Sequence, residues 1–250
     1  MRLTVLGKSP AWQDAGGACS GYLIEAGGTT LLLDFGNGVF AKLRERVPYD
    51  AVDAVVISHM HADHFFDLVS FSHALLLGPR SARPHLIVPP GGREVLRAAG
   101  ALWNDPELVQ SAFEVEECGP AAAAEVGAVS LRFTEVPHFI YAQAVDASGD
   151  GARLTFGADC GPNEGLVEFA RDTDLLMVEA TQAEHDSGSQ RGHMTAREAG
   201  ALGRRAGASR LVLTHFSDEL DEEHVRAEGE AGFGASVELA SEGATYELGA

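Results

Sequence analysis

The sequence predicts an α/β fold in which mixed β-sheets are layered with helices. Short apolar runs bounded by glycines and other turn residues recur along the chain, which is the pattern of short strands. Strand patterns dominate the first third and alternate with helix patterns later, which favours layered mixed sheets over one doubly wound parallel sheet. With 250 residues, 45% hydrophobic and 22% charged, the composition is that of a globular protein, and we expect one domain over residues 1–250.

The predicted strands are short, and several are rich in branched apolar residues. Segment 52–58 is apolar and continuous, as expected for a strand that is buried on both faces. Strands are expected at 3–6, 22–26, 29–34, 52–58, 85–88, 128–134, 154–157, 175–178, 211–214, 237–239 and 245–248.

Apolar residues at helical spacing indicate helices between these strands. Thr195 and Glu198 have the spacing of a capping box, which marks the start of one helix. The stretch from 100 to 128 is the least regular, and we expect a variable loop there. Helices are expected at 39–46, 65–77, 92–99, 163–170, 195–206 and 219–228.

The charge balance and the cysteine count limit the function classes. The 18 Lys and Arg residues against 37 Asp and Glu residues give a net charge of −19, which disfavours a large nucleic-acid interface. Cys19, Cys118 and Cys160 are scattered, so they form no disulfide framework and fit a reducing cytoplasm. The chain has no run of about 18 apolar residues, and its first residues resemble a strand rather than a signal peptide, so we expect no membrane span.

The strongest functional pattern is a histidine-rich loop directly after the buried strand 52–58. In His59-Met60-His61-Ala62-Asp63-His64, three imidazoles and one carboxylate lie within six residues. Such groups suit zinc and other borderline divalent ions. Because a catalytic ion keeps one position open for water, four ligand groups exceed what one ion needs, and we expect two ions that share the loop.

Three later residues have the placement expected of further metal ligands. Each is a ligand-type residue just past the end of a predicted strand, where sheets of this kind present functional groups. Since the histidine-rich loop needs partners, we expect these residues to complete the metal site. They are His138, Asp159 and His215.

Together these residues resemble the metallo-β-lactamase fold superfamily, whose hallmark is a His-x-His-x-Asp-His loop followed by a later His, Asp and His. The resemblance covers the chain from residue 3 to about 216, and it implies an αββα sandwich of two mixed β-sheets flanked by helices. It also implies two divalent metal ions, with zinc favoured and manganese or iron compatible with the same ligands. Carried over by position, His59, His61 and His138 would hold the first metal, Asp63, His64 and His215 the second, and Asp159 would bridge them.

The second half is similar to the ribonuclease Z branch of that superfamily and to its small phosphodiesterase-like members, some of which act on cyclic nucleotides. The matching segments are 156–163, 178–181 and 192–195. Glu179 and His193 match a proton-donating pair of that branch, whereas Val178 and Met194 replace a His and a Ser of its motifs.

The resemblance implies a hydrolase of phosphodiesters in which Asp63 is the base and His193, oriented by Glu179, protonates the leaving group. We expect a small substrate such as a cyclic nucleotide, because the net charge is negative and no insertion matches the basic arm with which ribonuclease Z clamps transfer RNA. The alternatives are 3′-end processing of transfer RNA and hydrolysis of a lactone or thioester. Dimers are common in this branch, so the resemblance also implies a homodimer.

Other polar residues are expected to act indirectly or not at all. Asp34 follows a strand and should support the metal loop by hydrogen bonding rather than bind metal, and Cys160 should be a buried small side chain. The loop with His185 is placed to line the substrate entrance. The isolated histidines, expected to have no direct role, are His73, His85, His185 and His224.

Overall fold

The computed structural model describes residues 1–184 and 191–249, and its strands form two seven-stranded sheets. The first sheet is mixed, with antiparallel pairs at one side and parallel pairs at the other. In order across this sheet, the strands are β14 (Thr245–Glu247), β1 (Arg2–Gly7), β2 (Gly21–Ala26), β3 (Thr29–Leu33), β4 (Ala54–Val56), β5 (His85–Val88) and β6 (Glu114–Glu117).

The second sheet has the same mixed character, with antiparallel hairpins at one side and parallel strands at the other. Parallel strands end at the same edge of their sheet, so loops that follow them lie close together. In order across this sheet, the strands are β13 (Glu238–Leu239), β12 (Arg210–Thr214), β11 (Leu175–Glu179), β10 (Ala152–Phe156), β9 (Ala142–Gly149), β8 (Val129–Val136) and β7 (Ala123–Val126).

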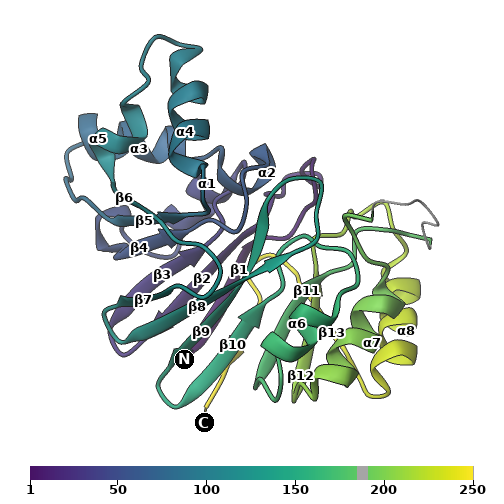
Figure 1. Ribbon diagram of the computed structural model, residues 1–250. Helices are drawn as coiled ribbons and strands as arrows, with labels where there is room; N and C mark the ends of the chain where they lie inside the picture. Colours follow the sequence, from purple (N-terminus) through teal and green to yellow (C-terminus); the bar gives the residue numbers. More distant parts are fainter. Residues whose placement is uncertain (185–190, 250) are drawn as a thin grey trace.

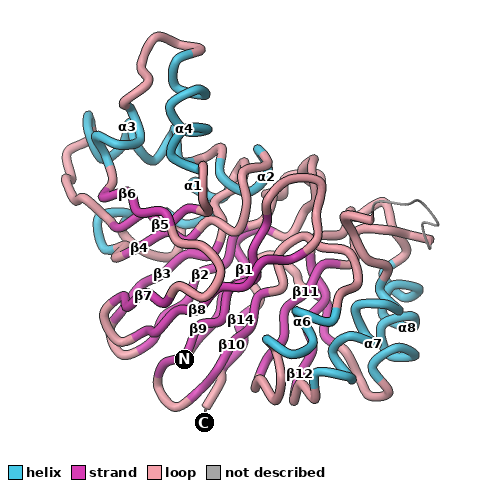
Figure 2. Tube along the Cα trace, viewed as in Figure 1, coloured by secondary structure: helices cyan, strands magenta, loops and turns pink. Residues whose placement is uncertain are grey.

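Helices cover the outer face of each sheet, so the fold is the αββα sandwich that the sequence predicts (Figure 1; Figure 2). The first sheet is covered by α1 (Val39–Arg44), α2 (Ala62–Phe65), α3 (Leu68–Leu77), α4 (Gly92–Ala101) and α5 (Leu108–Ala112). The second is covered by α6 (Glu164–Phe169), α7 (Ala196–Ala206) and α8 (Glu222–Phe233). Among the described residues, no helix has both the length and the apolar character needed to cross a membrane.

The central hydrophobic core lies between the two sheets and fixes their relative position. Tyr22 of β2 and Phe156 of β10 are buried, and their ring centroids are 5.2 Å apart. The hydroxyl groups of Tyr22 and Thr214, at the end of β12, share a hydrogen bond of 2.8 Å. Because these contacts lie next to the strand ends, they hold the loops of the first sheet against those of the second.

The prediction of an irregular loop from 100 to 128 is wrong, because this stretch contains α5, β6 and β7. Both strands lie at sheet edges, where solvent covers one side and a strand needs few branched apolar residues. The three glutamates of β6 also protect that edge from pairing with other chains. Strand β9 was missed as well, because it is rich in alanine and contains Asp146, a residue type that strands disfavour.

The helix predictions hold, with differences at the ends. The capping box of Thr195 and Glu198 is present at the start of α7. The helix predicted at 65–77 begins later, as α3 at Leu68, and the separate short helix α2 ends at Phe65; α8 begins at Glu222 because the Asp221 carboxylate caps it. Asp221 Oδ1 accepts hydrogen bonds from the backbone N–H groups of Glu223 (3.0 Å) and His224 (3.4 Å).

Candidate metal centre

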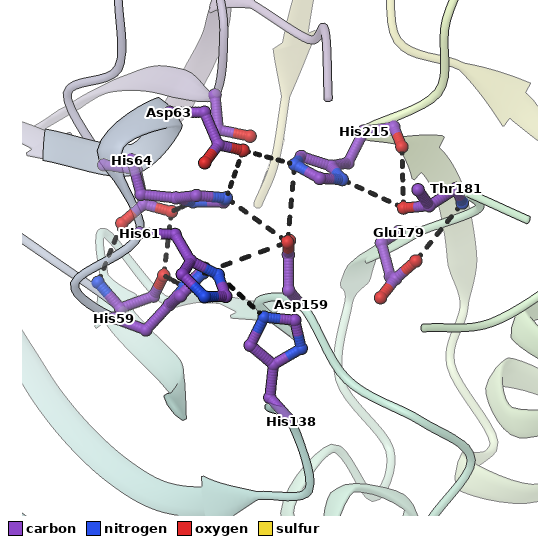
Figure 3. Close-up of polar contacts among 12 residues, drawn as sticks. His59, His61, Asp63, His64, His138, Asp159, Glu179, Thr181 and His215 are labelled. Atoms are coloured by element: carbon purple, nitrogen blue, oxygen red, sulfur yellow. Dashed lines mark hydrogen bonds and ion pairs between the residues drawn. The ribbon is translucent and has the colours of Figure 1, made fainter. Parts of the chain in front are cut away.

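The seven residues predicted to bind metal meet at one edge of the sandwich, where strands of both sheets end (Figure 3). Four lie in the loop and short helix α2 after β4 of the first sheet, and three follow β8, β10 and β12 of the second sheet. These seven side chains fall into two adjoining clusters, and the ligand atoms within each lie within 4.8 Å of one another; two overlapping groups of the same kind include His193. The clusters contain His59, His61 and His138, and Asp63, His64, Asp159 and His215.

Three strand ends at this edge have an unusual backbone conformation. Asp34 (φ 57°), Ala158 (φ 54°) and His215 (φ 55°) are in the left-handed region, directly after β3, next to Asp159, and after β12. This region is unfavourable for most residues other than glycine, and in proteins it is concentrated at functional sites. The surrounding structure therefore holds the site residues in place at some conformational cost.

The first cluster joins three imidazole rings from both sheets. His61 Nδ1 lies 3.1 Å from His59 Nε2 and 3.0 Å from His138 Nε2. The Ser58 hydroxyl accepts from His59 Nδ1–H (3.0 Å), and the Gly192 carbonyl accepts from His138 Nδ1–H (2.7 Å). Both Nε2 atoms therefore carry lone pairs that face the same place, an arrangement that fits a cation.

Burial keeps these three rings neutral. It lowers the pKa of His138 to about 4, lowers the pKa of His61, and holds the pKa of His59 well below its ordinary value. Neutral imidazole is the form that binds metal ions. The protonation state and the geometry of the first cluster thus both suit a divalent cation.

The second cluster combines two imidazoles with two carboxylates. His64 Nε2 lies 3.3 Å from Oδ2 of both Asp63 and Asp159, and His215 Nε2 lies 3.3 Å and 3.4 Å from the same oxygens. Thr181 donates its hydroxyl hydrogen to the His215 carbonyl and accepts from His215 Nδ1–H, both at 2.9 Å. His64 Nε2 is buried and has no hydrogen-bond partner, as expected for an atom that binds an ion.

Asp159 lies between the two clusters. In addition to its contacts with His64 and His215, its Oδ2 is 3.9 Å from His59 Nε2. Burial raises the pKa of this carboxyl group, but the neighbouring His215 and His64 outweigh that effect and hold the pKa well below its ordinary value. A charged carboxylate in this place can contact ions in both clusters.

Asp34 orients one histidine of each cluster, His64 directly and His59 through Ser58. Its carboxylate is fully buried and accepts hydrogen bonds from His64 Nδ1–H (2.7 Å), Ser58 N–H (2.7 Å) and Ser58 Oγ–H (2.9 Å). Since the Ser58 hydroxyl hydrogen goes to Asp34, the Ser58 oxygen is left to accept from His59. The supporting role expected of Asp34 therefore has a direct structural basis.

Glu179 and His193 form a hydrogen-bonded pair beside the second cluster. Glu179 Oε1 accepts from His193 Nδ1–H (2.8 Å) and from the Cys160 N–H (2.9 Å). Its Oε2 accepts from the N–H groups of Thr181 (3.2 Å) and Met194 (3.3 Å). Burial alone would lower the pKa of His193, but the Glu179 carboxylate outweighs it and raises that pKa. The pair can hold a proton close to the metal-binding groups.

A cavity of about 560 Å³ opens above the second cluster. It is lined by residues 10–13 of the loop after β1 and by residues of the candidate site. Its size is typical of sites for small molecules. The side chains that line it include Trp12, His61, Asp63, Asp159, Thr181, His193 and His215.

The remaining predictions differ in outcome. Cys160 is buried, as expected. His85 lies 3.4 Å from Glu116 at the far side of the first sheet, and His224 and His73 are exposed on helices, so none belongs to the two clusters. His185 lies outside the described residues.

Sequence reasoning missed several residues that contact the site, namely Ser58, Thr181, Gly192 and Trp12. Ser58 immediately precedes the histidine-rich loop and Thr181 ends the matching segment 178–181, and these positions are the signal that could have found them. Gly192 begins the matching segment 192–195, but it acts through its backbone carbonyl, which its residue type does not indicate, and Trp12 lies in a distant loop without a motif.

Comparisons with known proteins agree with this geometry. Residues 29–216 match the family model described as the Beta-lactamase superfamily domain. The probable metallo-hydrolase YhfI of Bacillus subtilis is 29% identical over 248 residues, covering 99% of this chain and 100% of the relative. The ribonuclease Z of Myxococcus xanthus is 30% identical over 303 residues, covering 99% of this chain and 98% of the relative. The crystal structure of YhfI, at 26% identity, has a TM-score of 0.88 and covers 98% of this chain and 99% of that chain.

Proposed function

Because this chain belongs to the beta-lactamase superfamily and has the fold of its metallo-hydrolases, we propose that it is a single-domain phosphodiesterase with two divalent metal ions and a small substrate such as a cyclic nucleotide. The observation that carries this proposal is the Glu179–His193 pair, 2.8 Å apart and next to the metal-binding groups. A phosphodiester with a poor leaving group needs a proton donor at this place, whereas a lactone or thioester has less need of one.

The ligand sets support two ions of a borderline type, with zinc favoured. His59, His61 and His138 would hold one ion, and Asp63, His64 and His215 the other, with Asp159 shared. When bound, such a pair lowers the pKa of water towards about 7 and stabilises negative charge on a phosphodiester.

The proton transfers are assigned to residues of this chain. Asp63 holds one oxygen 3.3 Å from His64 and His215 and lines the cavity, so it is placed to orient water and take up its proton. His193 donates Nδ1–H to Glu179, which leaves Nε2 to carry the proton for the leaving alkoxide. Glu179 favours the protonated ring because its carboxylate is buried and already accepts three backbone hydrogen bonds.

A small substrate is favoured over transfer RNA by charge and by chain length. The net charge of −19 repels a polyanion outside the cavity. The alignment with the Myxococcus xanthus ribonuclease Z extends over 303 positions against 250 residues here, so that relative contains segments that this chain lacks. Processing of transfer RNA nevertheless stays the second candidate, because that relative is 30% identical and this chain has the Glu179–His193 pair.

A substrate panel tests the proposal. Purified protein with its metal is assayed on 3′,5′-cyclic AMP, bis(p-nitrophenyl) phosphate, precursor transfer RNA and a homoserine lactone. Hydrolysis of the two small diesters is expected. Cleavage of precursor transfer RNA alone would establish the second candidate, and hydrolysis of the lactone alone would refute both.

The role of His193 is tested by the dependence on the leaving group. His193→Ala should lower kcat for cyclic AMP by about 10²-fold or more, since a general acid contributes about 10²–10⁴-fold. The loss should be much smaller for bis(p-nitrophenyl) phosphate, whose leaving group needs no proton. The matched control is His73→Ala, at an exposed position of α3. Equal losses on both diesters, or a loss below about threefold on cyclic AMP, would exclude a proton donor.

A further inference from the structure

The cavity is lined in part by a loop that the proposed chemistry leaves unused. The metal-binding residues that line it are polar and charged, whereas the loop residues that line it are residues 10–13, Pro-Ala-Trp-Gln. Trp12 is the large apolar side chain of this loop, and 53% of its surface is exposed. A half-exposed indole beside a catalytic cavity has apolar area that a ligand can cover.

The Trp12 loop is fixed by buried polar contacts. Lys8 is 6% exposed, donates to the Phe216 carbonyl (2.9 Å), and lies 2.5 Å from Asp14 Oδ2. Asp14 Oδ1 accepts from the Asp218 N–H (2.9 Å), and Ser9 Oγ accepts from the Asp14 N–H (2.9 Å). Both ends of the loop are therefore held.

The same contacts connect this loop to the metal-binding residue His215. Phe216 directly follows His215 and Asp218 lies two residues further on, so the segment that carries His215 also anchors the loop. The Lys8 ammonium lies over the Phe216 ring, 4.3 Å from its centroid. The backbone on both sides of Trp12 is thereby anchored to the segment that carries His215 before a ligand binds, which reduces the entropy cost of binding.

We propose that Trp12 is a specificity-determining residue that stacks on the nucleobase of the substrate, while the phosphate group lies at the two clusters. This inference rests on the proposed function for the position of the phosphate. An indole face stacks on any base because every base has a π-face, and a cavity of about 560 Å³ has room for a base, a sugar and a phosphate. The site is accordingly one for a nucleotide rather than for an acyl lactone.

Tryptophan fluorescence tests the stacking without relying on turnover. The chain has two tryptophans, and Trp103 contacts Phe66 at a centroid distance of 6.4 Å rather than lining the cavity. In metal-loaded Trp103→Phe protein, AMP should quench the remaining fluorescence of Trp12, and ribose 5-phosphate should not. Equal quenching by the two ligands, absence of AMP binding in the millimolar range, or AMP binding without quenching would overturn the inference.

A kinetic comparison separates the inference from the proposed function. The substrates are 3′,5′-cyclic AMP and its abasic analogue, methyl ribofuranoside 3′,5′-cyclic phosphate, which have the same scissile bond. Trp12→Ala should lower the ratio of kcat/KM values for the two by about 5- to 150-fold, the range that base stacking provides. Trp12→Phe should restore most of that ratio, and Trp103→Ala is the control. An unchanged ratio in Trp12→Ala would overturn base stacking and leave the proposed phosphodiesterase function standing. Failure of the wild-type protein to hydrolyse either diester would refute the proposed function. In that case the fluorescence result would still decide the role of Trp12.

Discussion

Replacing Asp34 with Asn should weaken metal binding while leaving the fold in place. Asn tolerates the left-handed backbone at this position (φ 57°), and its side-chain carbonyl can still accept from the Ser58 N–H. The amide NH₂ group, however, would replace Oδ2 and would face His64 Nδ1, which donates to Oδ2 across 2.7 Å in the native protein. Two donors cannot share that contact, so His64 would shift its hydrogen to Nε2 or turn away.

The magnitude follows from the lost hydrogen bond. A hydrogen bond to a charged group contributes about 1.5–3 kcal/mol, and about 1.4 kcal/mol corresponds to a tenfold change in an equilibrium constant. The affinity of the second cluster for zinc should therefore fall by about 10- to 150-fold. The free energy of unfolding of the metal-free protein should fall by much less, because two of the three hydrogen bonds to Asp34 can be remade.

The assay is competition for zinc against a chelating dye, with urea unfolding of the metal-free protein alongside. The matched control is Asp53→Asn, an exposed aspartate at the other end of β4, which accepts a hydrogen bond of 2.8 Å from the Thr30 N–H. This control should bind zinc as the wild type does. Equal zinc affinity in Asp34→Asn and wild type would refute the idea that Asp34 fixes the metal-binding nitrogen of His64.

Two further predictions concern Gly36, which packs against the backbone of the histidine-rich loop, and the metal ions. Gly36→Ala should lower the free energy of unfolding by about 1–3 kcal/mol and lower the metal content, because the added Cβ would lie 1.8 Å from the Asp63 carbonyl. The control is Gly165→Ala in α6, whose Cβ would meet nothing closer than 3.4 Å. Similar urea midpoints for the two variants would contradict this prediction. Chelation should lower Tm by about 10–20 °C, since each of the two proposed ions at 100 times its Kd contributes about 2.7 kcal/mol and a chain of this size shifts by about 2–4 °C per kcal/mol. Calorimetry with and without added zinc checks this, and an unchanged Tm would speak against resident ions.

The parts of the fold that local sequence determines were predictable. Buried strands such as β5 and β12 contain a continuous run of three apolar residues, and the Thr195–Glu198 box defines its own helix start. Strand β9 could not be found this way, because its Asp146 is stabilised by contacts made only in the folded chain. Arg153 Nε lies 2.8 Å from Asp146, and Arg132 pairs with it as well.

In the candidate site, too, the features that local sequence determines were predictable, and those that depend on tertiary contacts were not. His59, His61 and His64 could be predicted from their spacing, and their distant partners from their placement just past predicted strand ends, while the family resemblance implied which residues hold which ion. The hydrogen bonds that fix each ring come from tertiary contacts, such as the carbonyl of Gly192 on His138. The position of Trp12 against the site depends on a buried lysine more than 200 residues from Phe216 in the chain, a contact with no local signature.

Each ligand cluster takes side chains from both sheets, since His59, His61, Asp63 and His64 belong to the first and the other three residues to the second. With cations in place, coordinate bonds would link the two sheets at this rim. At the opposite rim the sheets are joined by apolar packing and by hydrogen bonds such as Gly27 N–H to Asp150 (2.9 Å) and Ala128 N–H to Thr29 (2.8 Å), which are weaker than coordinate bonds. The halves should therefore part from the opposite rim first when the protein is pulled mechanically, with the catalytic rim acting as the hinge.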